Sequence, residues 1–376
     1  MYFIKDKYLP PKRLNKYLKD LEVFNRLNVI GQSVLGKPIY SLQIGNGEIK
    51  ILIWSQMHGN EPTSTKSLVD FCFFLLNKKK SNRILKKITF LIIFQLNPDG
   101  SELFTRNNAN DKDLNRDAQN LSQPESKLLY SCFKKFKPRY CFNMHGQRSI
   151  YNVSNTKNPA VVSFLSPPPN KENDLTESRK DAMRLIVKAY EKIESIKKNI
   201  VGIYDDTFNA NCFGDFFSQQ GASTILFEAG HFRNDFERNL SRKLIFESLK
   251  VMTNSLIKSD FNKTNYSKYF EIPKNNNLMR DIIITNVNLN IENKIQKNCN
   301  VAIQYQELLV NKRIKLVPII QDFGYKLKYI TTELHINKSS NIIYNLDIGD
   351  NAENILNDVN YVKKNDFNRQ WINKIQ

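Results

Sequence analysis

The residues best able to do chemistry in this chain are histidines and acids that follow short apolar runs. His58 and His145, two of the four histidines, each follow such a run and precede a glycine. His58 opens an HxxE arrangement that ends at Glu61. Catalytic zinc commonly takes three ligands from His and carboxylate and leaves one position open for water. His58, Glu61 and His145 could supply that set, although a helix-capping glutamate and a structural histidine remain alternatives for each motif alone.

Glu228 is a candidate general base, because it directly follows the apolar residues Ile225 to Phe227. Partial desolvation at the end of a buried strand raises the pKa of a carboxylate toward the range that proton transfer needs. A solvated glutamate at a strand end would not explain an acid placed straight after such a run. We therefore predict a catalytic role for Glu228.

These side chains need a scaffold that brings distant segments together. Buried strands are predicted over 49–56, 88–96, 140–145, 161–165 and 223–228. Helices are predicted from apolar spacing over 61–77, 175–196 and 235–257. Strands alternating with helices predict an α/β fold with a mostly parallel (mixed) central sheet and helices on both faces. Such sheets carry their sites at the carboxyl ends of strands, where His58, Asn97, His145 and Glu228 are expected.

The composition changes along the chain and suggests several parts. A catalytic domain is expected over 1–260, a linker rich in Asn, Lys and Tyr over 261–277, and a small antiparallel β domain over 278–349. The tail over 350–376 is expected to be partly helical. The polar segment 97–124 is long for a loop, and long loops tend to be functional. Its start, Asn97-Pro98-Asp99-Gly100, is expected to form a turn in which Gly100 is free to adopt a positive φ.

Several motifs occur together and in a fixed order. They are His58-Gly59-Asn60-Glu61-Pro62, Asn97-Pro98-Asp99-Gly100, Arg106, Asp113-Leu114-Asn115-Arg116-Asp117, His145 and Phe227-Glu228-Ala229-Gly230. With these motifs in this order, the chain resembles the zinc metallocarboxypeptidases related to carboxypeptidase A. Within that family it resembles the bacterial cytoplasmic-type members. The motifs span residues 58–230, so the resemblance covers most of residues 1–260 and none of the C-terminal part.

The resemblance implies a role for each matching residue. It implies that His58, Glu61 and His145 bind one zinc ion and that Glu228 is the general base. It further implies that Arg106 polarises the scissile carbonyl and that Asn115 and Arg116 bind the terminal carboxylate of the substrate. Asp113 matches the aspartate that hydrogen-bonds the first ligand histidine and so orients it.

The chemistry of these residue types agrees with the implied roles. Arginine offers a planar fork that pairs two-to-two with a carboxylate, which suits Arg116 for holding a chain terminus. A surface salt bridge with Asp113 or Asp117 is the alternative reading of Arg116. Arg106 can stabilise a developing oxyanion, and removing one such donor typically costs about 2.7–4 kcal/mol of barrier.

Other positions depart from the family pattern or extend it. Tyr204 is the candidate for the family's mobile tyrosine, although a packing role is the simpler reading. Asn60 replaces an arginine that carboxypeptidase A has between its first two ligands, so one substrate contact is in doubt. Arg148 is a candidate for added positive charge in the substrate pocket. His231 and His335 are expected to be structural.

The expected function is that of a zinc exopeptidase that removes a C-terminal residue by zinc-activated water. Its substrate would be a peptide or small amide with a free C-terminal carboxylate. An amidohydrolase of the same fold acting on N-acyl amino acids and a non-catalytic peptide binder are the alternatives. A panel of peptides and acyl amino acids, with and without chelator, separates them.

Composition limits the other classes of function. Hydrophobic residues make up 41% and charged residues 25% of the 376 positions, which excludes a disordered chain or a fibre. No apolar run approaches the ~20 residues that span a bilayer, and the first 20 residues do not read as a secretory signal. Five scattered cysteines indicate reduced thiols and a cytoplasmic location.

The formal net charge of +19 raises the question of an anionic partner. Nucleic-acid binding is one reading and a solvated, lysine-rich surface is the other. The lysines are diffuse and accompanied by much asparagine, so nucleic acid is not expected. The cluster Lys78-Lys79-Lys80 is expected at a helix end, where cations interact favourably with the helix dipole.

Overall fold

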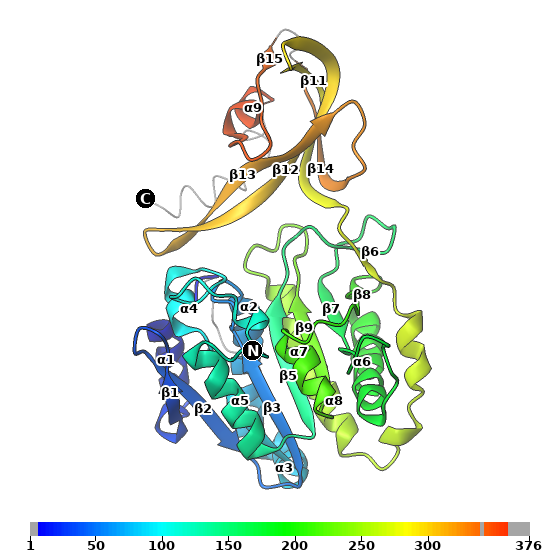
Figure 1. The fold of residues 1–376 in the computed structure, drawn as a ribbon. Helices are drawn as coiled ribbons and strands as arrows, with labels where there is room; N and C mark the ends of the chain where they lie inside the picture. The colour runs from blue at the N-terminus through cyan, green and yellow to red at the C-terminus, as the bar shows by residue number, and fades with distance from the viewer. Residues whose placement is uncertain (1–6, 339–341, 360–376) are drawn as a thin grey trace. The chain divides into compact units, whose positions relative to one another are not determined.

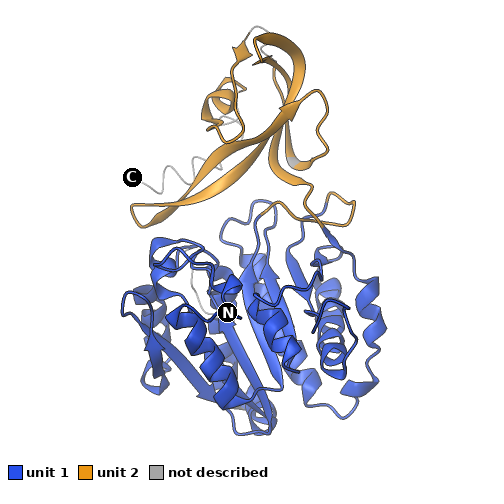
Figure 2. Cartoon of the chain, viewed as in Figure 1, with its two compact units in different colours: residues 1–148, 158–275 blue, residues 149–157, 276–376 orange. Residues whose placement is uncertain are grey.

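The computed structural model describes residues 7–338 and 342–359, which form two compact units (Figures 1 and 2). Unit 1 comprises the described residues of 1–148 and 158–275, and unit 2 those of 149–157 and 276–376. Each unit has its own hydrophobic core. Residues 149–157 therefore group with a part of the chain that begins more than a hundred positions later.

Unit 1 is built on an eight-stranded mixed sheet in the order β1-β2-β4-β3-β5-β9-β7-β8. The strands are β1 (Asn28–Gln32), β2 (Pro38–Ile44), β3 (Ile49–Ser55), β4 (Ile88–Ile93), β5 (Tyr140–Gly146), β7 (Val162–Leu165), β8 (Val201–Ile203) and β9 (Ser223–Ala229). The four central strands β4, β3, β5 and β9 are parallel, while β2 joins β4 and β7 joins β9 in antiparallel pairs. The predicted fold class is confirmed, and each predicted strand is present.

Helices cover both faces of this sheet. One face carries α1 (Pro11–Asp20), α2 (Pro62–Leu76), α3 (Lys78–Lys87), α6 (Glu177–Ile196) and α8 (Asn239–Leu256), and the other carries α5 (Pro124–Phe136) and α7 (Phe213–Gln219). The three predicted helices correspond to α2, α6 and α8. The cluster Lys78-Lys79-Lys80 opens α3 instead of ending a helix, because Asn77 separates α2 from α3.

The predicted long loop is partly helical. It contains α4 (Pro98–Leu103) and the 3-10 turn η2 (Leu114–Arg116). The Asn97 side chain accepts a hydrogen bond from the Gly100 N–H at 2.8 Å and so caps α4. The expectation that Gly100 adopts a positive φ is wrong, because Gly100 is part of this helix. A Cβ at Gly100 would instead lie 2.5 Å from Nδ2 of Asn97.

Unit 2 contains a five-stranded sheet. Strands β11 (Met279–Ile291), β12 (Lys294–Val310) and β13 (Arg313–Gly324) are antiparallel, whereas β14 (Ile330–Ile336) and β15 (Ile343–Tyr344) pair with β11 in parallel. The sheet is therefore antiparallel-rich but mixed. Of the expected helical tail, α9 (Glu353–Asp358) is described, and residues 360–376 lie outside the described residues.

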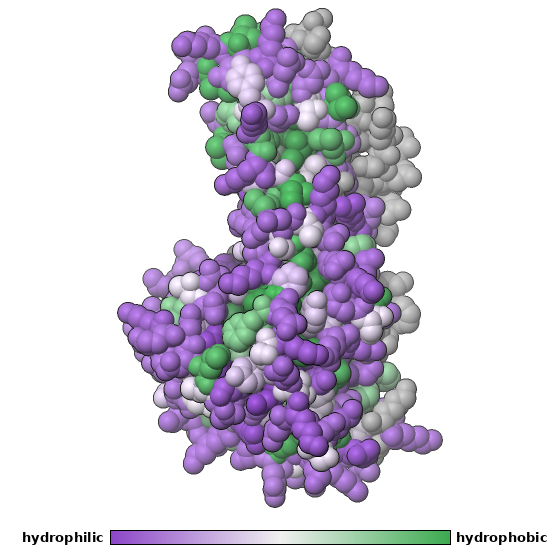
Figure 3. All heavy atoms as spheres, turned by 90° about the vertical axis from the view of Figure 1, so that its right-hand side faces the viewer, coloured by the Kyte–Doolittle hydropathy of each residue, from purple (hydrophilic) through white to green (hydrophobic). Residues whose placement is uncertain are grey.

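The remaining elements are short. They are η1 (Phe24–Arg26), η3 (Phe261–Lys263), η4 (Tyr266–Glu271) and the paired strands β6 (Asn152–Val153) and β10 (Asn275–Asn276). Hydrophilic side chains predominate on the face drawn in Figure 3, with hydrophobic ones scattered among them. Within the described ranges, none of the helices combines the length and the apolar character needed to cross a bilayer.

Candidate active site and metal centre

Three elements position the predicted ligand residues. His58 follows the end of β3, Glu61 immediately precedes α2, and His145 lies near the end of β5. Strands β3 and β5 are neighbours, so their carboxyl ends bring the two imidazoles to the same edge of the sheet. The Ser64 hydroxyl of α2 donates to the His145 carbonyl oxygen and ties this helix to β5.

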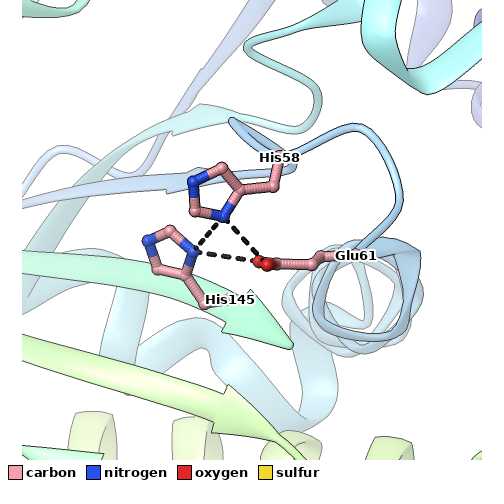
Figure 4. Close-up of side chains that lie close together, drawn as sticks. All are labelled: His58, Glu61 and His145. Atoms are coloured by element: carbon pink, nitrogen blue, oxygen red, sulfur yellow. Dashed lines mark hydrogen bonds and ion pairs between the residues drawn. The ribbon is translucent and has the colours of Figure 1, made fainter. Parts of the chain in front are cut away.

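The three side chains point toward one another (Figure 4). Nδ1 of His58 lies 2.9 Å from Oε1 of Glu61, and Nδ1 of His145 lies 2.9 Å from Oε2 of the same carboxylate. The two Nδ1 atoms are 3.1 Å apart. One ligand atom from each residue thus lies within 4.8 Å of the others. Two imidazole nitrogens and a carboxylate form the kind of donor set that zinc prefers, so these residues fit a zinc ion.

The charges around the cluster show why it suits a cation. Burial lowers the pKa of His58, but the carboxylates of Glu61 and Asp113 outweigh burial and raise the pKa above its ordinary value. Burial lowers the pKa of His145, which Glu61 only partly offsets. Burial alone would raise the pKa of Glu61, but the two histidines hold that pKa well below its usual range. An ionised, largely buried carboxylate between two imidazoles is the arrangement that a divalent cation would compensate.

Asp113 and Arg106 surround the first ligand. Oδ1 of Asp113 lies 3.0 Å from Nε2 of His58, on the side of the ring away from Glu61. The Arg106 guanidinium donates to Oδ2 of Asp113 at 3.0 and 3.1 Å, and its Nη1 lies 3.4 Å from Oε1 of Glu61. The half-exposed Arg106 therefore places positive charge beside the ligand cluster.

Glu228 lies on β9, directly opposite His145 of β5 in the register of the parallel pair. Its Oε2 atom is buried and accepts no hydrogen bond. Burial raises the pKa of Glu228 well above its ordinary value, the Glu61 carboxylate adds to this, and Arg106 and Arg238 oppose it. A carboxyl group with a raised pKa next to a candidate metal site has the property that a proton-transfer residue needs.

Asn115 and Arg116 lie on η2, next to the start of α7. Oδ1 of Asn115 accepts a hydrogen bond from the Phe213 N–H at 3.0 Å. Nη1 of the exposed Arg116 donates to the Asn115 carbonyl at 2.7 Å and lies 3.1 Å from Sγ of Cys212. Sequence reasoning missed Cys212 and Phe213, because nothing in their local pattern indicates that α7 packs against a loop about a hundred positions earlier.

The remaining predicted residues lie on loops near the strand ends. Tyr204 follows β8, and its N–H donates to the Phe164 carbonyl of β7 at 3.0 Å. Arg148 is exposed three residues after His145. Among these residues, Asn60 has a buried side-chain oxygen, Oδ1, without a hydrogen-bond partner.

The other two histidines lie elsewhere. His231 makes an edge-to-face contact with Phe236, with ring centroids 5.8 Å apart. His335 lies on β14 in unit 2, with Nε2 3.9 Å from Oε2 of Glu333. All four histidines lie in the described part of the chain. Among them, only His58 and His145 form, with a carboxylate, a three-residue group that could hold a metal ion.

Comparison with known families supports the resemblance. Residues 14–120 match the family model described as zinc carboxypeptidase. This range contains His58, Glu61, Arg106 and the Asp113–Arg116 motif, whereas His145 and Glu228 lie beyond it.

Curated relatives are carboxypeptidases that match parts of the chain. Carboxypeptidase SOL1 of Arabidopsis thaliana is 29% identical over 161 residues, covering 38% of this chain and 33% of that protein. Carboxypeptidase D of Mus musculus is 32% identical over 148 residues, covering 33% of this chain and 11% of that protein. The chain thus spans a third or less of the length of these relatives.

Solved structures share the fold over about two thirds of the chain. A metallo-carboxypeptidase from Pseudomonas aeruginosa, in complex with (2-guanidinoethylmercapto)succinic acid, gives a TM-score of 0.54 at 18% identity and covers 67% of this chain and 71% of that one. Carboxypeptidase A from Helicoverpa armigera gives 0.53 at 16% identity, covering 67% and 75%. The resemblance to the zinc metallocarboxypeptidases is therefore confirmed for the motifs within residues 14–120 and for the fold.

Proposed function

We propose that this chain, which shares its fold and its ordered motifs with the zinc carboxypeptidases, hydrolyses the C-terminal peptide bond of peptides. The observation that carries the proposal is the convergence of His58, Glu61 and His145 with Glu228 in register on the next strand. The three ligand residues would hold one zinc ion. When bound, zinc supplies Lewis-acid chemistry, lowering the pKa of water to about 7 and polarising a carbonyl.

The chain's own residues would bind and orient the substrate. Arg116 and Asn115 would bind the terminal carboxylate, because a guanidinium fork and an amide can together satisfy both of its oxygens. An internal peptide bond offers no carboxylate at that position, so cleavage is limited to chain ends. Arg106, beside Glu61, would stabilise the negative charge that develops on the carbonyl oxygen.

Glu228 would move the proton. Its carboxylate would accept a proton from the attacking water as the new C–O bond forms, and it would deliver that proton to the leaving nitrogen as the C–N bond breaks. The products are a peptide shortened by one residue and a free amino acid. Asp113 would hold His58 in the tautomer that leaves Nδ1 free to bind the metal.

Metal analysis of the purified chain together with mass spectrometry of a mixed peptide library tests this function. We expect about one zinc per chain and products shortened by one C-terminal residue, with activity lost to a chelator and regained with zinc. Acyl amino acids serve as the comparison substrates. Turnover confined to those compounds would instead support a deacylase, and zinc binding without any turnover would support a non-catalytic binder.

A further inference from the structure

The amino-terminal edge of the parallel strands in unit 1 carries a dense group of exposed cations. We call this group the basic edge. It consists of Lys50, Lys79, Arg83, Lys86, Lys87, Lys134, Lys135, Lys137 and Arg139.

Strand register brings the centre of the basic edge together. Lys87 ends α3 directly before β4, and Lys50 pairs with Thr89 of β4. The Arg139 N–H donates to the Lys50 carbonyl at 3.0 Å, one residue before β5 begins. Neighbouring strands lie about 4.8 Å apart, so these three cations form one row across β4, β3 and β5.

Two helices extend this row to both faces of the sheet. Lys79, Arg83 and Lys86 are spaced by four and three residues, so they share one side of α3. Helix α5 packs against the opposite face and ends at Phe136, leading into Lys137. The cations thus form a two-dimensional array across the thickness of the domain, instead of a line.

Little negative charge compensates this array. The segments 78–87 and 134–139 contain no acidic residue, and Glu48 is the acid beside Lys50. Asp181 pairs with Arg139 at 3.0 Å but also with Arg184 at 2.7 Å. Helix dipoles account for only part of the pattern. Lys86, Lys87, Lys134 and Lys135 lie in the last turns of α3 and α5, where a cation is favourable, but Lys79 lies in the first turn of α3, where it is unfavourable.

We propose that the basic edge binds the surface of a lipid bilayer that contains anionic lipids. Seven of its nine cations are lysines, which act as point charges and suit a diffuse anionic plane. Phe73 is 48% exposed and lies one turn before the end of α2, close in sequence to α3. Exposed aromatic side chains are common at sites that enter the membrane interface. Single-stranded nucleic-acid sites instead track one backbone along a groove, whereas this array covers a broad edge.

This binding mode would leave the candidate active site open to water. His58, His145 and Glu228 lie at the carboxyl ends of the same strands. Strand β3 has seven residues, so the two edges are separated by about 23 Å. A chain bound by its basic edge would present the catalytic edge to the aqueous phase and act on soluble substrates.

Vesicle co-sedimentation with the full chain tests the proposal. We expect binding to vesicles of phosphatidylcholine mixed with phosphatidylglycerol, no binding to phosphatidylcholine alone, and loss of binding at high salt. The variant Lys86→Glu/Lys87→Glu/Lys134→Glu/Lys135→Glu should bind at least a hundredfold more weakly, since each lysine near an anionic surface contributes roughly fivefold. The matched control Lys12→Glu/Lys16→Glu/Lys171→Glu/Lys243→Glu has the same net charge and reverses exposed lysines on other elements. It should retain most of the binding.

Equal loss in the two variants would overturn the proposal, because net charge alone would then explain binding. So would preferential binding of duplex DNA over anionic vesicles at the same salt concentration. Since charge reversal in the last turns of α3 and α5 could unfold them, a second measurement uses the unaltered chain. Bound vesicles should protect the lysines of the basic edge from reductive methylation while leaving the four control lysines reactive, and uniform reactivity would contradict the proposal.

Discussion

His58 and His145 are both buried beside Glu61, but their pKa values are shifted in opposite directions. His58 is held between the carboxylates of Glu61 and Asp113, which favours its charged form. His145 contacts the carboxylate of Glu61 but not that of Asp113, and burial favours its neutral form. A metal ion requires both Nδ1 atoms to be free of protons, so protonation of His58 would compete with metal binding. Under the proposed function, metal affinity would therefore depend on pH, and Glu228, which is not among the three proposed ligands, would be available for proton transfer.

The first prediction concerns Glu228. Glu228→Gln keeps the shape of the side chain but removes the proton acceptor, so turnover of a peptide substrate should fall by about 10²–10⁴. Zinc content, measured by metal analysis, should be unchanged. Glu48→Gln, at an exposed turn, is the matched control and should have ordinary activity. Near-normal turnover in Glu228→Gln would refute the assignment of the base.

The second prediction concerns two buried aspartates whose pKa values are shifted in opposite directions. Burial raises the pKa of Asp215 to about 6. At Asp215 the folded state therefore binds more protons than the unfolded state between pH 4 and 6. The contribution of Asp215 to the free energy of unfolding should fall by about 2–3 kcal/mol as the pH rises through that window. Asp215→Asn should remove most of this fall, measured by urea unfolding as a function of pH.

Asp117 provides the contrast. Burial alone would raise the pKa of Asp117, but hydrogen bonds from Ser122 and Gln123 lower it. The ionised Asp117 stabilises the fold at a pH above the pKa that it has in the unfolded chain. This stabilisation is lost as the pH falls through the lower pKa of the folded state. Asp117→Asn should therefore cost about 1–3 kcal/mol at neutral pH. A gain in stability there would contradict the interpretation.

At the scale of elements, the site depends on loops that pack against one another. The segment between β3 and α2, which carries His58, lies directly on α4. The Asn97 side chain donates to the Met57 carbonyl at 3.1 Å, and Gln56 donates to the Gly59 carbonyl at 2.9 Å. These hydrogen bonds, together with the close approach of the Gly59 backbone to Gly100, hold the segment that carries His58.

The third prediction follows from this contact. A Cβ at Gly59 would lie 1.9 Å from the carbonyl carbon of Gly100, and backbone atoms cannot yield as a flexible side chain can. Gly59→Ala should cost about 3 kcal/mol or more of stability and weaken zinc binding, measured by denaturation and metal titration. Gly36→Ala is the control, because no atom lies within 4 Å and only its positive φ opposes substitution, at about 1 kcal/mol. Equal effects of the two substitutions would rule out the contact as the cause.

At the scale of the whole molecule, the described residues form two hydrophobic clusters in unit 1 and one in unit 2. The unit 1 sheet is packed on both faces, while the unit 2 core is formed chiefly by β11, β12, β13 and α9. The ligand cluster lies entirely in unit 1. Chains with separate cores need not unfold in a single transition.

The fourth prediction concerns metal removal. Under the proposed function, zinc would bind only the folded form of unit 1, and at a thousandfold excess over its dissociation constant it should stabilise that unit by about 4 kcal/mol. Scanning calorimetry should show two transitions, of which a chelator lowers only one. His58→Ala should abolish the difference in transition temperature between zinc-loaded and chelated samples. Equal shifts of both transitions would show that the two units unfold together.

Much of this arrangement follows from local sequence patterns. The central strands are continuous apolar runs, because a parallel sheet is buried on both faces, and their order along the chain places His58, His145 and Glu228 after strand ends. The lysine-rich helix α3 was not predicted, because Ile84 and Leu85 are the only apolar residues among its ten positions and two apolar residues are too few to define a helical period. Strand β8 has only three residues and is too short to recognise from alternation.

The sequence by itself determined the types of residue at the site, their order and the family they resemble, because these depend on chemistry at individual positions. Tertiary structure alone decided that Asn115 packs against the start of α7, that Gly59 lies against Gly100, and that residues 149–157 belong with the C-terminal sheet. Each of these depends on contact between segments far apart in the chain. Local periodicity reports only whether a side chain is buried, and it contains no information about which distant segment buries it.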